Sequence, residues 1–580
     1  MTISLRQYTT LLLDYLRPQG RKAALLAVLL LGSIGLQLLN PQILRHFIDS
    51  AMSGGRGEVL VRAALLLLAV GLTNQVLSAL ATYVGADVGW SATNLLRADL
   101  ALHCLNLDMP FHNERTPGEL IERIDGDVTA LSNFFSQFVI RVLGSALLLV
   151  GALLLVMRED WRVGLVLTLY AMVAAVMMNR VRDIAVPSTM AEREASAKLF
   201  GFLEERLAGL EDIRANGGGP YTMRRFYGLI YALFHKGRAA WMMRGRIWVL
   251  LIGIFVLGDL LALGMGIYLY RAGMITLGTV YLFFQYNELL RVPLEQITQQ
   301  MQELQKAGAS VGRIAELRRI EPAIRDGQGA AIPYGALAVE FAHVTFAYGE
   351  HDTVLRNISF RLDAGRTLGL LGRTGSGKST LTRLLFRLYE PAAGTVRLGG
   401  IDTRETTHTE LRGRVGMVTQ EVQLFHATVR DNLTFFDKEI PDERILRVIE
   451  ELGLQEWYDA LPQGLDTGLT AGGGGLSSGE AQLLAFTRVF LQDPGLVLLD
   501  EPSSRLDPAT ERLLERAMER LLRGRTALII AHRLSTVQRA DEILIMDNGR
   551  VAEHGLREAL ARDHTSHFYR LLQTGLERAA

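Results

Sequence analysis

The chain carries one stretch that fits the phosphate-loop pattern at every position: Gly372, Arg373, Thr374, Gly375, Ser376, Gly377, Lys378 and Ser379. It follows the apolar run 368–371, and Thr380 continues it into a predicted helix. The glycines allow backbone N–H groups to converge on phosphate oxygens, and the helix N-terminus adds partial positive charge. We expect Lys378 to neutralise the β- and γ-phosphates of ATP and Ser379 to ligate Mg²⁺. A strand, a loop and a helix in this order favour an α/β fold.

A second apolar run, 496–499, ends in two adjacent carboxylates, Asp500 and Glu501. Asp500 is expected to hold Mg²⁺ through water, and Glu501 to polarise the attacking water. His532 follows another apolar run, 528–530. From the end of that predicted strand its side chain can reach a γ-phosphate. Taken alone, a strand with two terminal carboxylates and a single histidine could both be structural. The phosphate loop makes the catalytic interpretation the better one for the two carboxylates, whereas the role of His532 depends on the motifs that accompany it.

From about residue 337 to residue 580 the pattern predicts an α/β domain with a parallel sheet. The strand-like segments are Val339–Phe346, Thr367–Leu371, Arg414–Val418, Leu496–Leu499 and Ala527–Ile530. We treat 321–336 as a linker. Residues 1–320, which precede the linker, contain long apolar stretches instead.

Residues 1–320 contain six apolar stretches of spanning length, at 22–49, 59–84, 134–157, 161–182, 246–270 and 276–298. Each is long enough to cross the roughly 30 Å hydrocarbon core as a helix. Buried helices of a large soluble protein are the alternative, and six such runs argue against it. The first run is too long for a cleavable signal peptide. The formal net charge is zero, so nothing suggests nucleic-acid binding, and a single cysteine, Cys104, excludes an internal disulfide.

The loops predict the topology of this all-α membrane domain. The segments 85–133 and 183–245 are long and rich in arginine, whereas the other connections are short. Positive residues favour the cytoplasmic side, so both long segments, the N-terminus and the α/β domain are predicted to be cytoplasmic. Proline and glycine interrupt each long segment, which predicts two cytoplasmic turns near 110–119 and 210–220.

A further motif lies between the two halves of the ATP site. Leu476, Ser477, Ser478, Gly479 and Glu480 resemble LSGGQ, the signature of ATP-binding cassettes. The resemblance extends to the adenine-stacking aromatic residue, the Q-loop, the D-loop and the H-loop, at Tyr348, Gln420, Asp507 and His532. Over its whole length the chain resembles a half-transporter of the multidrug-exporter type, with six helices before one cassette that includes a helical subdomain.

This resemblance implies a mechanism and a partner. Two cassettes would meet head to tail around two ATP molecules, each lying on the phosphate loop of one cassette and under Ser477 and Gly479 of the other. Gln420 would join Ser379 and Asp500 around Mg²⁺, and the two cytoplasmic turns would be coupling helices. One cassette cannot complete a site, so a second ABC half-transporter is required. Closure and hydrolysis would alternate the access of a small hydrophobic substrate across a bacterial inner or plasma membrane.

The signature departs from the family pattern, because Ser478 replaces glycine and Glu480 replaces glutamine. At roughly 8 Å and an effective dielectric of about 20, a carboxylate would repel a phosphate charge by on the order of 2 kcal/mol. Lys378, Gln420 and Glu501 are intact. This combination favours a heterodimer with one degenerate site over a homodimer, and predicts a partner with an intact signature and no catalytic glutamate.

Three functions remain to be compared. The favoured one is an ATP-driven exporter of hydrophobic or amphipathic compounds such as drugs, lipids or peptides. A cassette-gated channel is the main alternative, and a nutrient importer fits less well because importers usually place the cassette on a separate chain. Asp259, Glu288 and Arg291 lie within predicted spans and are candidates for the cavity wall. An internal ion pair or a position near the lipid interface would explain them equally well.

Overall fold

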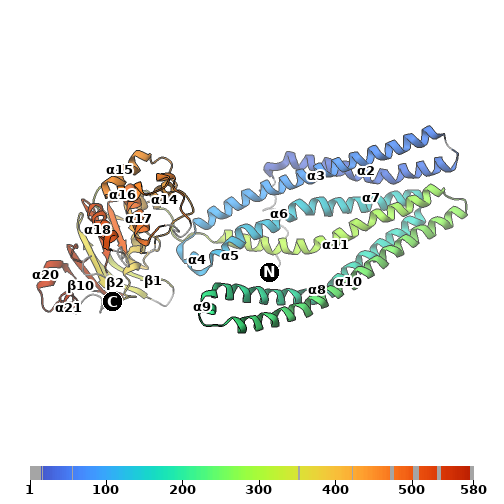
Figure 1. Ribbon diagram of the computed structural model, residues 1–580. Helices are drawn as coiled ribbons and strands as arrows, with labels where there is room; N and C mark the ends of the chain where they lie inside the picture. The colour runs from blue at the N-terminus through green and yellow to red at the C-terminus, as the bar shows by residue number, and fades with distance from the viewer. Residues whose placement is uncertain are drawn as a thin grey trace. The chain divides into compact units, whose positions relative to one another are not determined.

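The computed structural model describes residues 15, 17–54, 56–349, 353–420, 422–470, 476–500, 508–531 and 537–574. The chain divides into two compact units, of which the first ends at Ile320 and the second begins at Glu321. One short segment of the N-terminal part, Leu107–Arg115, is grouped with the second unit by its contacts. Figure 1 shows helices throughout the first unit and a sheet-containing second unit.

Helices of unusual length build the first unit. Its elements are η1 (Arg17–Gln19), α2 (Gly20–Met52), α3 (Gly57–Leu105), α5 (Pro117–Ile121), η2 (Glu122–Gly126), α6 (Asp127–Gln137), η3 (Phe138–Leu143), α7 (Gly144–Glu159), α8 (Trp161–Ala208), α9 (Leu210–Ala215), α10 (Gly219–Arg271) and α11 (Leu277–Arg319). With 53 residues, α10 is about 80 Å long, more than twice the roughly 30 Å hydrocarbon core. Such helices can therefore continue well beyond a bilayer.

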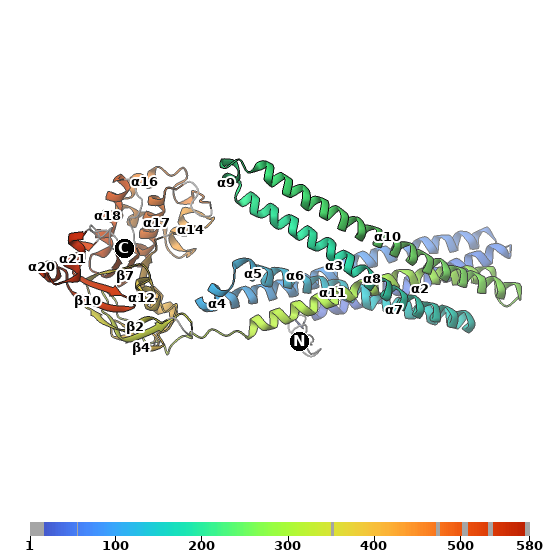
Figure 2. The ribbon, with the colours of Figure 1, turned by 90° about the horizontal axis from the view of Figure 1, so that it is seen from below.

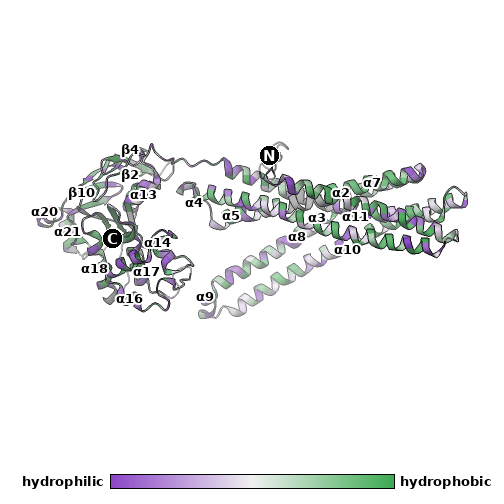
Figure 3. Ribbon diagram, turned by 90° about the horizontal axis from the view of Figure 1, so that it is seen from above, coloured by the Kyte–Doolittle hydropathy of each residue, from purple (hydrophilic) through white to green (hydrophobic). Residues whose placement is uncertain are grey.

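Five helical segments in the described part of the chain are long and apolar enough to cross a membrane: Arg17–Met52, Gly57–Leu105, Arg141–Glu159, Trp161–Ala208 and Gly219–Arg271. They correspond to the first five predicted spans. The sixth prediction falls at the start of α11, which has 43 residues but carries Glu288, Arg291 and Glu295 in the predicted span. In Figure 3 hydrophobic residues dominate the halves of α2, α7, α10 and α11 that lie farther from α9.

Short turns join these helices, as their sequences predict. Asp160 is the only residue between α7 and α8, and its carboxylate accepts hydrogen bonds from the backbone N–H groups of Arg162 and Val163 at 2.8 and 3.4 Å. Gly273 adopts φ +69° directly after α10, which allows Met274 to close the helix end onto the carbonyl of Leu269. These caps fix the two hairpins α7–α8 and α10–α11.

Polar side chains join α2, α7 and α11 at their connecting-turn ends. Arg45 of α2 donates to Glu159 of α7 at 2.6 Å. The Asp49 carboxylate accepts the Gly278 backbone N–H at 2.9 Å, and the Thr276 hydroxyl at 2.8 Å. We call this group, Arg45, Asp49, Glu159, Thr276 and Gly278, the turn-end network. It holds three helices together that no short loop connects directly.

The hairpin α8–α9–α10 diverges from the other helices over its α9-proximal half (Figures 1 and 2). Along this part of α10 aromatic side chains recur every seven residues, with one further aromatic between two of them. Tyr227, Tyr231, Phe234, Trp241 and Trp248 are each between 61% and 71% exposed. Spacings of three, four and seven residues place them on one face of the helix. This face, which we call the aromatic stripe, is uncovered in the single chain.

The second unit contains two sheets. One has the strand order β10-β9-β3-β8-β7-β6, and the other has the order β2-β1-β4-β5. The strands are β1 (Val339–Ala347), β2 (Thr353–Leu362), β3 (Thr367–Gly372), β4 (Ala393–Leu398), β5 (Ile401–Asp402), β6 (Val415–Val418), β7 (Leu496–Asp500), β8 (Thr526–Ile530), β9 (Glu542–Asp547) and β10 (Arg550–Leu556). All five predicted strands are present, and β3, β6, β7 and β8 form the predicted parallel arrangement. The antiparallel sheet was not predicted, because strands such as β2 alternate buried residues with exposed ones and form no apolar run.

The helices of this unit surround the sheets. They are α4 (Met109–Glu114), α12 (Lys378–Leu385), α13 (His408–Arg414), α14 (Val429–Thr434), α15 (Asp442–Leu452), α16 (Gln455–Asp459), η4 (Gly464–Asp466), α17 (Ser478–Gln492), α18 (Pro508–Leu522), α20 (Arg557–Arg562) and α21 (His567–Thr574). Residues of α14, α15 and α17 share an apolar core with β7. This cluster is the predicted helical subdomain.

Candidate ATP site

The phosphate loop lies between β3 and α12, and its backbone depends on glycine. Gly372, Gly375 and Gly377 have φ values of +148°, +82° and +101°. A Cβ atom at Gly372 would lie 2.3 Å from the carbonyl oxygen of Met546, so a side chain there would force the backbone to move. The loop can keep its shape only with glycine at these positions.

Lys378 is buried, and its ammonium group folds back over this loop. It donates to the carbonyl oxygens of Gly372 at 2.6 Å and Arg373 at 3.1 Å. Within the described residues, the hydroxyl of Ser376 is buried without a hydrogen-bond partner. A fixed positive charge, a buried donor and a glycine-rich backbone suit the oxygens of a polyphosphate. Ser379 is exposed beside them, at the first turn of α12.

Strand register brings the other predicted residues to the same edge of the sheet. Leu370 of β3 pairs with Ile530 of β8, which in turn pairs with Asp500 of β7. Because these strands are parallel, their carboxyl ends meet where nucleotides bind in α/β proteins. Gln420 follows the neighbouring strand β6 by two residues and is exposed. Glu501, Asp507 and His532 lie outside the described residues, so the structure places only the strands that lead to two of them.

Tyr348 lies just beyond β1 and is 40% exposed. Its hydroxyl lies 3.0 Å from that of Thr380 and accepts a hydrogen bond from Arg383 at 2.9 Å, both on α12. The hydroxyl is therefore tied to the helix that follows the phosphate loop, while much of the ring is open to solvent. An exposed, anchored ring is suited to stacking against a planar base.

The signature segment begins α17, and the structure gives Glu480 a role that we did not predict. The Ser477 hydroxyl accepts the Glu480 backbone N–H at 3.2 Å, and the Glu480 carboxylate accepts the Ser477 backbone N–H at 2.6 Å. This reciprocal pair is a capping box, whose S-x-x-E pattern is visible in the sequence. The carboxylate thus stabilises the helix N-terminus and also places a negative charge there. Gly479 is buried within the first turn.

Sequence reasoning also missed two residues that join α4 to the second unit. Asn113 of α4 donates its side-chain amide to the hydroxyl of Tyr389 at 2.7 Å. At the other end of α4, Asp108 accepts the backbone N–H groups of Ala323 and Ile324. The predicted turn 110–119 is therefore split between α4 and α5. A polar residue on a turn gives no sequence signal for such a partner, which lies 276 residues away.

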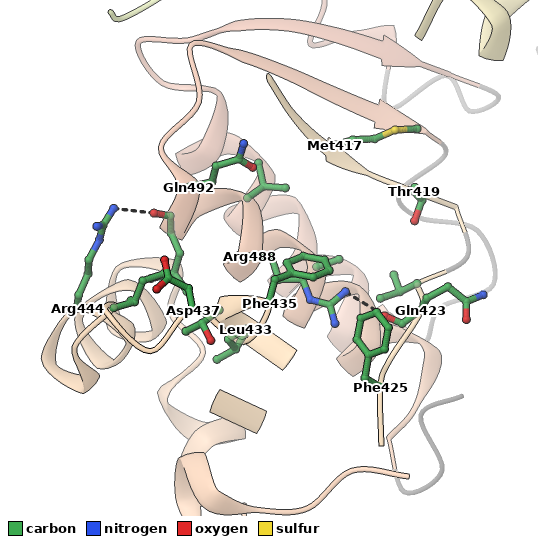
Figure 4. Close-up of a pocket in the computed structure, with 16 residues that line it drawn as sticks. Met417, Thr419, Gln423, Phe425, Leu433, Phe435, Asp437, Arg444, Arg488 and Gln492 are labelled. Atoms are coloured by element: carbon green, nitrogen blue, oxygen red, sulfur yellow. Dashed lines mark hydrogen bonds between the residues drawn. The ribbon is translucent and has the colours of Figure 1, made fainter. Parts of the chain in front are cut away.

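A groove of about 640 Å³ lies in the helical subdomain, between β6, α14 and α17 (Figure 4). Phe425 and Phe435 line it together with Asp437 and two arginines. Arg444 donates to the carbonyl of Leu491 at 2.6 Å. Burial lowers the pKa of Arg488 to about 10, and its guanidinium donates to the carbonyl of Asn432 at 2.6 Å. The groove combines apolar walls with fixed basic groups.

Within the first unit, the three predicted cavity residues lie on helices that contact one another. Asp259 lies on α10, and Glu288 and Arg291 lie on α11. Tyr170 of α8 donates its hydroxyl to the carbonyl of Ile254 on α10 at 3.2 Å. Asp259 accepts the side-chain amide of Asn287 at 2.9 Å, and Arg291 lies over the Phe255 ring at 4.7 Å. The cluster thus combines α8, α10 and α11.

Comparison with known proteins identifies the family. Residues 355–504 match the ABC transporter family, and residues 24–294 match the ABC transporter transmembrane region. An ABC transporter ATP-binding protein of Streptococcus pneumoniae is 31% identical, with 98% of each chain covered. The chain belongs to the ABC transporter family. A fatty acid ABC transporter ATP-binding/permease protein of Mycobacterium tuberculosis is also 31% identical, over 80% of this chain and 74% of that protein.

A solved structure of a bacterial Atm1-family ABC exporter with ATP bound has the same fold. Its TM-score is 0.79 at 24% identity, with 97% of this ABC transporter and 98% of that chain covered. The predicted fold class, a helical transmembrane domain followed by an α/β nucleotide-binding domain, is confirmed. This ABC transporter binds ATP and couples ATP hydrolysis to transport across a membrane.

Proposed function

We propose that this ABC transporter is one half of a dimeric exporter that moves hydrophobic or amphipathic compounds across a bacterial inner membrane. One observation carries the proposal. The same chain contains a parallel sheet with a phosphate loop at its edge and helices that are long enough to cross a bilayer and extend beyond it. The relative from Mycobacterium tuberculosis is named for fatty acids, which are amphipathic. Drugs, lipids and peptides of similar character belong to the proposed substrate class. The N-terminus and the cassette would be cytoplasmic.

In the proposed cycle, Tyr348 stacks on adenine and Lys378 holds the β- and γ-phosphates. Ser379, Gln420 and Asp500 offer the oxygen ligands that Mg²⁺ prefers, directly or through water. Mg²⁺ would neutralise developing phosphate charge, Glu501 would orient the attacking water, and His532 would contact the γ-phosphate. Arg373, Thr374 and Thr380 would complete the cradle of the phosphates.

The aromatic stripe on α10 supports a second half. Four of its exposed aromatic side chains, Tyr227, Tyr231, Phe234 and Trp241, precede the predicted span 246–270 and exceed the isolated apolar residues that a soluble surface normally shows. Large aromatic residues are enriched in protein interfaces, where they bury much area at little conformational cost. We assign this face to packing against the partner half.

The groove of Figure 4 supports the same arrangement. Among the residues that the structure describes, its arginines, Arg444 and Arg488, donate to backbone carbonyls and not to carboxylates. The second cytoplasmic turn, α9, begins with the acidic residues Glu211 and Asp212. Opposite charges across an apolar groove favour docking of a short acidic helix. We assign the groove to the α9 turn of the partner half, which would make both turns coupling helices.

The partner is proposed to be a different chain, with an intact signature and no glutamate after its Walker B aspartate. Support comes from the capping box, because Glu480 places a carboxylate where this chain would offer Ser477 and Gly479 to the partner's ATP. Its own phosphate loop keeps every required residue. An altered signature beside an intact phosphate loop is compatible with activity if the altered motifs of both halves lie in the same composite ATP site, so that the other site is complete.

The Asp259–Glu288–Arg291 cluster is proposed to form part of the substrate cavity. Ionisable groups in transmembrane helices are costly and are usually functional. The Asp259 contact to Asn287 and the stacking of Arg291 on Phe255 show that the cluster is also held together internally. A structural ion-pair role would leave substrate affinity unchanged when Glu288 is replaced by glutamine.

Proteoliposomes test the proposed function. The chain and the product of its neighbouring reading frame are reconstituted together and supplied with ATP, Mg²⁺ and a fluorescent fatty acid or a lipophilic dye. Uphill accumulation that stops when ATP is omitted supports an exporter. ATP-dependent ion conductance without accumulation of any amphipathic probe would instead indicate a cassette-gated channel.

A further inference from the structure

Three aromatic rings connect the predicted adenine-stacking position to the interior of the second unit. Tyr348 meets Tyr389 edge to face at 5.1 Å, with an interplanar angle of 88°. Phe346 contacts both rings, at 4.9 and 5.6 Å, in the same manner. Edge-to-face contacts of this kind are directional, so the position of one ring constrains the next. A base that fixes Tyr348 therefore constrains Tyr389.

The Tyr389 side chain also contacts α4. Its ring is only 6% exposed, and its hydroxyl accepts the Asn113 amide at 2.7 Å. Asn113 lies near the C-terminal end of α4, while Asp108 at the opposite end bonds the backbone at Ala323 and Ile324. One end of α4 thus depends on the linker, and the other depends on the ring that touches Tyr348.

We propose that Tyr389 is a positioning residue that couples occupancy of the adenine site to α4, the first cytoplasmic turn. The proposal rests on the proposed role of Tyr348 in stacking adenine. When a base stacks on Tyr348, the three rings settle into one arrangement, and the Tyr389 hydroxyl holds Asn113. When the base leaves, the three rings regain conformational freedom, and the hydrogen bond between the Tyr389 hydroxyl and Asn113 of α4 weakens. Because such coupling is reciprocal, docking of α4 tightens ATP binding by the same factor.

Hydrogen–deuterium exchange tests this without knowledge of the transported compound. The full chain, with its partner, is placed in lipid nanodiscs and incubated with saturating ATP and EDTA, so that nothing is hydrolysed. Exchange at 372–379 reports ATP binding, and exchange at 109–115 reports α4. In the wild type, ATP should slow exchange in both segments, by roughly fivefold in α4, as expected for one hydrogen bond.

The variant Tyr389→Phe keeps the ring and removes the hydroxyl. It should still show ATP protection at 372–379 but lose most of the ATP-dependent protection at 109–115. Asn113→Ala should behave in the same way, and the double variant should be no worse than either single variant, because both changes delete one bond. Tyr569→Phe is the matched control, since its ring contacts His564 on the C-terminal side of the cassette.

The outcomes separate the inference from the proposed function. Equal ATP-dependent protection of α4 in the wild type and in Tyr389→Phe would overturn the inference, as would unprotected α4 in the ATP-bound wild type. Absence of ATP protection at 372–379 in the wild type would instead reject the ATP site itself. An ATP Kd raised by no more than about fivefold in each variant, and no further in the double variant, agrees with the reciprocal coupling.

Discussion

The Glu480 side chain has two opposing effects: it stabilises the start of α17, and its charge repels a phosphate bound there. Its carboxylate completes a capping box with Ser477, which stabilises α17 by about 1 kcal/mol. The same negative charge occupies the helix end that would otherwise offer partial positive charge to a phosphate. A glutamine could make the same backbone hydrogen bond without the charge. The cap therefore does not require the acid.

The substitution Glu480→Gln tests the effect of the negative charge separately from the effect of the cap. Glu480→Gln should leave the thermal stability within about 1 kcal/mol of the wild type, because the cap is preserved. It should raise the ATPase activity of the chain assayed without a partner, since the repulsion of on the order of 2 kcal/mol is removed. Glu480→Ala is the control that removes both the charge and the cap. An unchanged rate in Glu480→Gln would show that this carboxylate does not impair the signature.

Glu501 is the residue on which hydrolysis should depend most. Because it follows Asp500 at the end of β7, Glu501→Gln should lower ATP turnover by roughly 10²–10⁴-fold, the usual effect of a positioned base. ATP affinity should remain close to that of the wild type, since Lys378 and the phosphate loop are untouched. Phosphate release by the purified pair measures the first quantity, and equilibrium ATP binding measures the second. Wild-type turnover in this variant would contradict the assignment.

Among the elements, the helices α2, α7 and α11 depend on polar contacts at one end. Arg45, Asp49 and Glu159 hold these helices together where no short loop does so directly. If the N-terminus is cytoplasmic, as proposed, these contacts lie at the outer end of the membrane domain, which an exporter must open to release a substrate. Part of this turn-end network is then expected to break in each cycle.

Crosslinking tests that requirement. In the variant Arg45→Cys/Glu159→Cys, a short bifunctional thiol reagent with a cleavable disulfide should stop transport while ATP still binds. A reductant should restore transport. The wild type is a nearly thiol-free control, because its one cysteine, Cys104, is buried. Undiminished transport by fully crosslinked protein would show that α2 and α7 stay together throughout the cycle.

The elements also show what could be predicted from the sequence. The phosphate loop, the strands β3, β7 and β8, and the apolar spans are encoded by contiguous residues, so local pattern identified them. The antiparallel sheet, the groove around Arg488 and the bond between Asn113 and Tyr389 depend on residues far apart in the chain. Asp259, Glu288 and Arg291 were selected because charges are costly in lipid, but only packing brings Asp259 of α10 to Asn287 of α11, and Arg291 of α11 to Phe255 of α10.

For the whole molecule, the central prediction concerns the partner. The chain expressed alone should hydrolyse ATP poorly, because each site of a homodimer would use the altered signature. Addition of a partner with an intact signature should raise ATP turnover, and Ser478→Gly combined with Glu480→Gln should help the lone chain more than the pair. Phosphate release from both preparations in lipid nanodiscs measures this. Robust, substrate-stimulated activity of the lone wild-type chain would refute the heterodimer.

The uncovered aromatic stripe on α10 also affects the life of the protein in the cell. If the stripe packs against a partner half, as proposed, a newly made chain without that partner exposes Tyr227, Tyr231, Phe234 and Trp241 to water. Exposed apolar faces of this kind are what chaperones retain and proteases of the quality-control system remove. Surplus copies should therefore be degraded, and balanced synthesis of both halves would decide how much transporter accumulates.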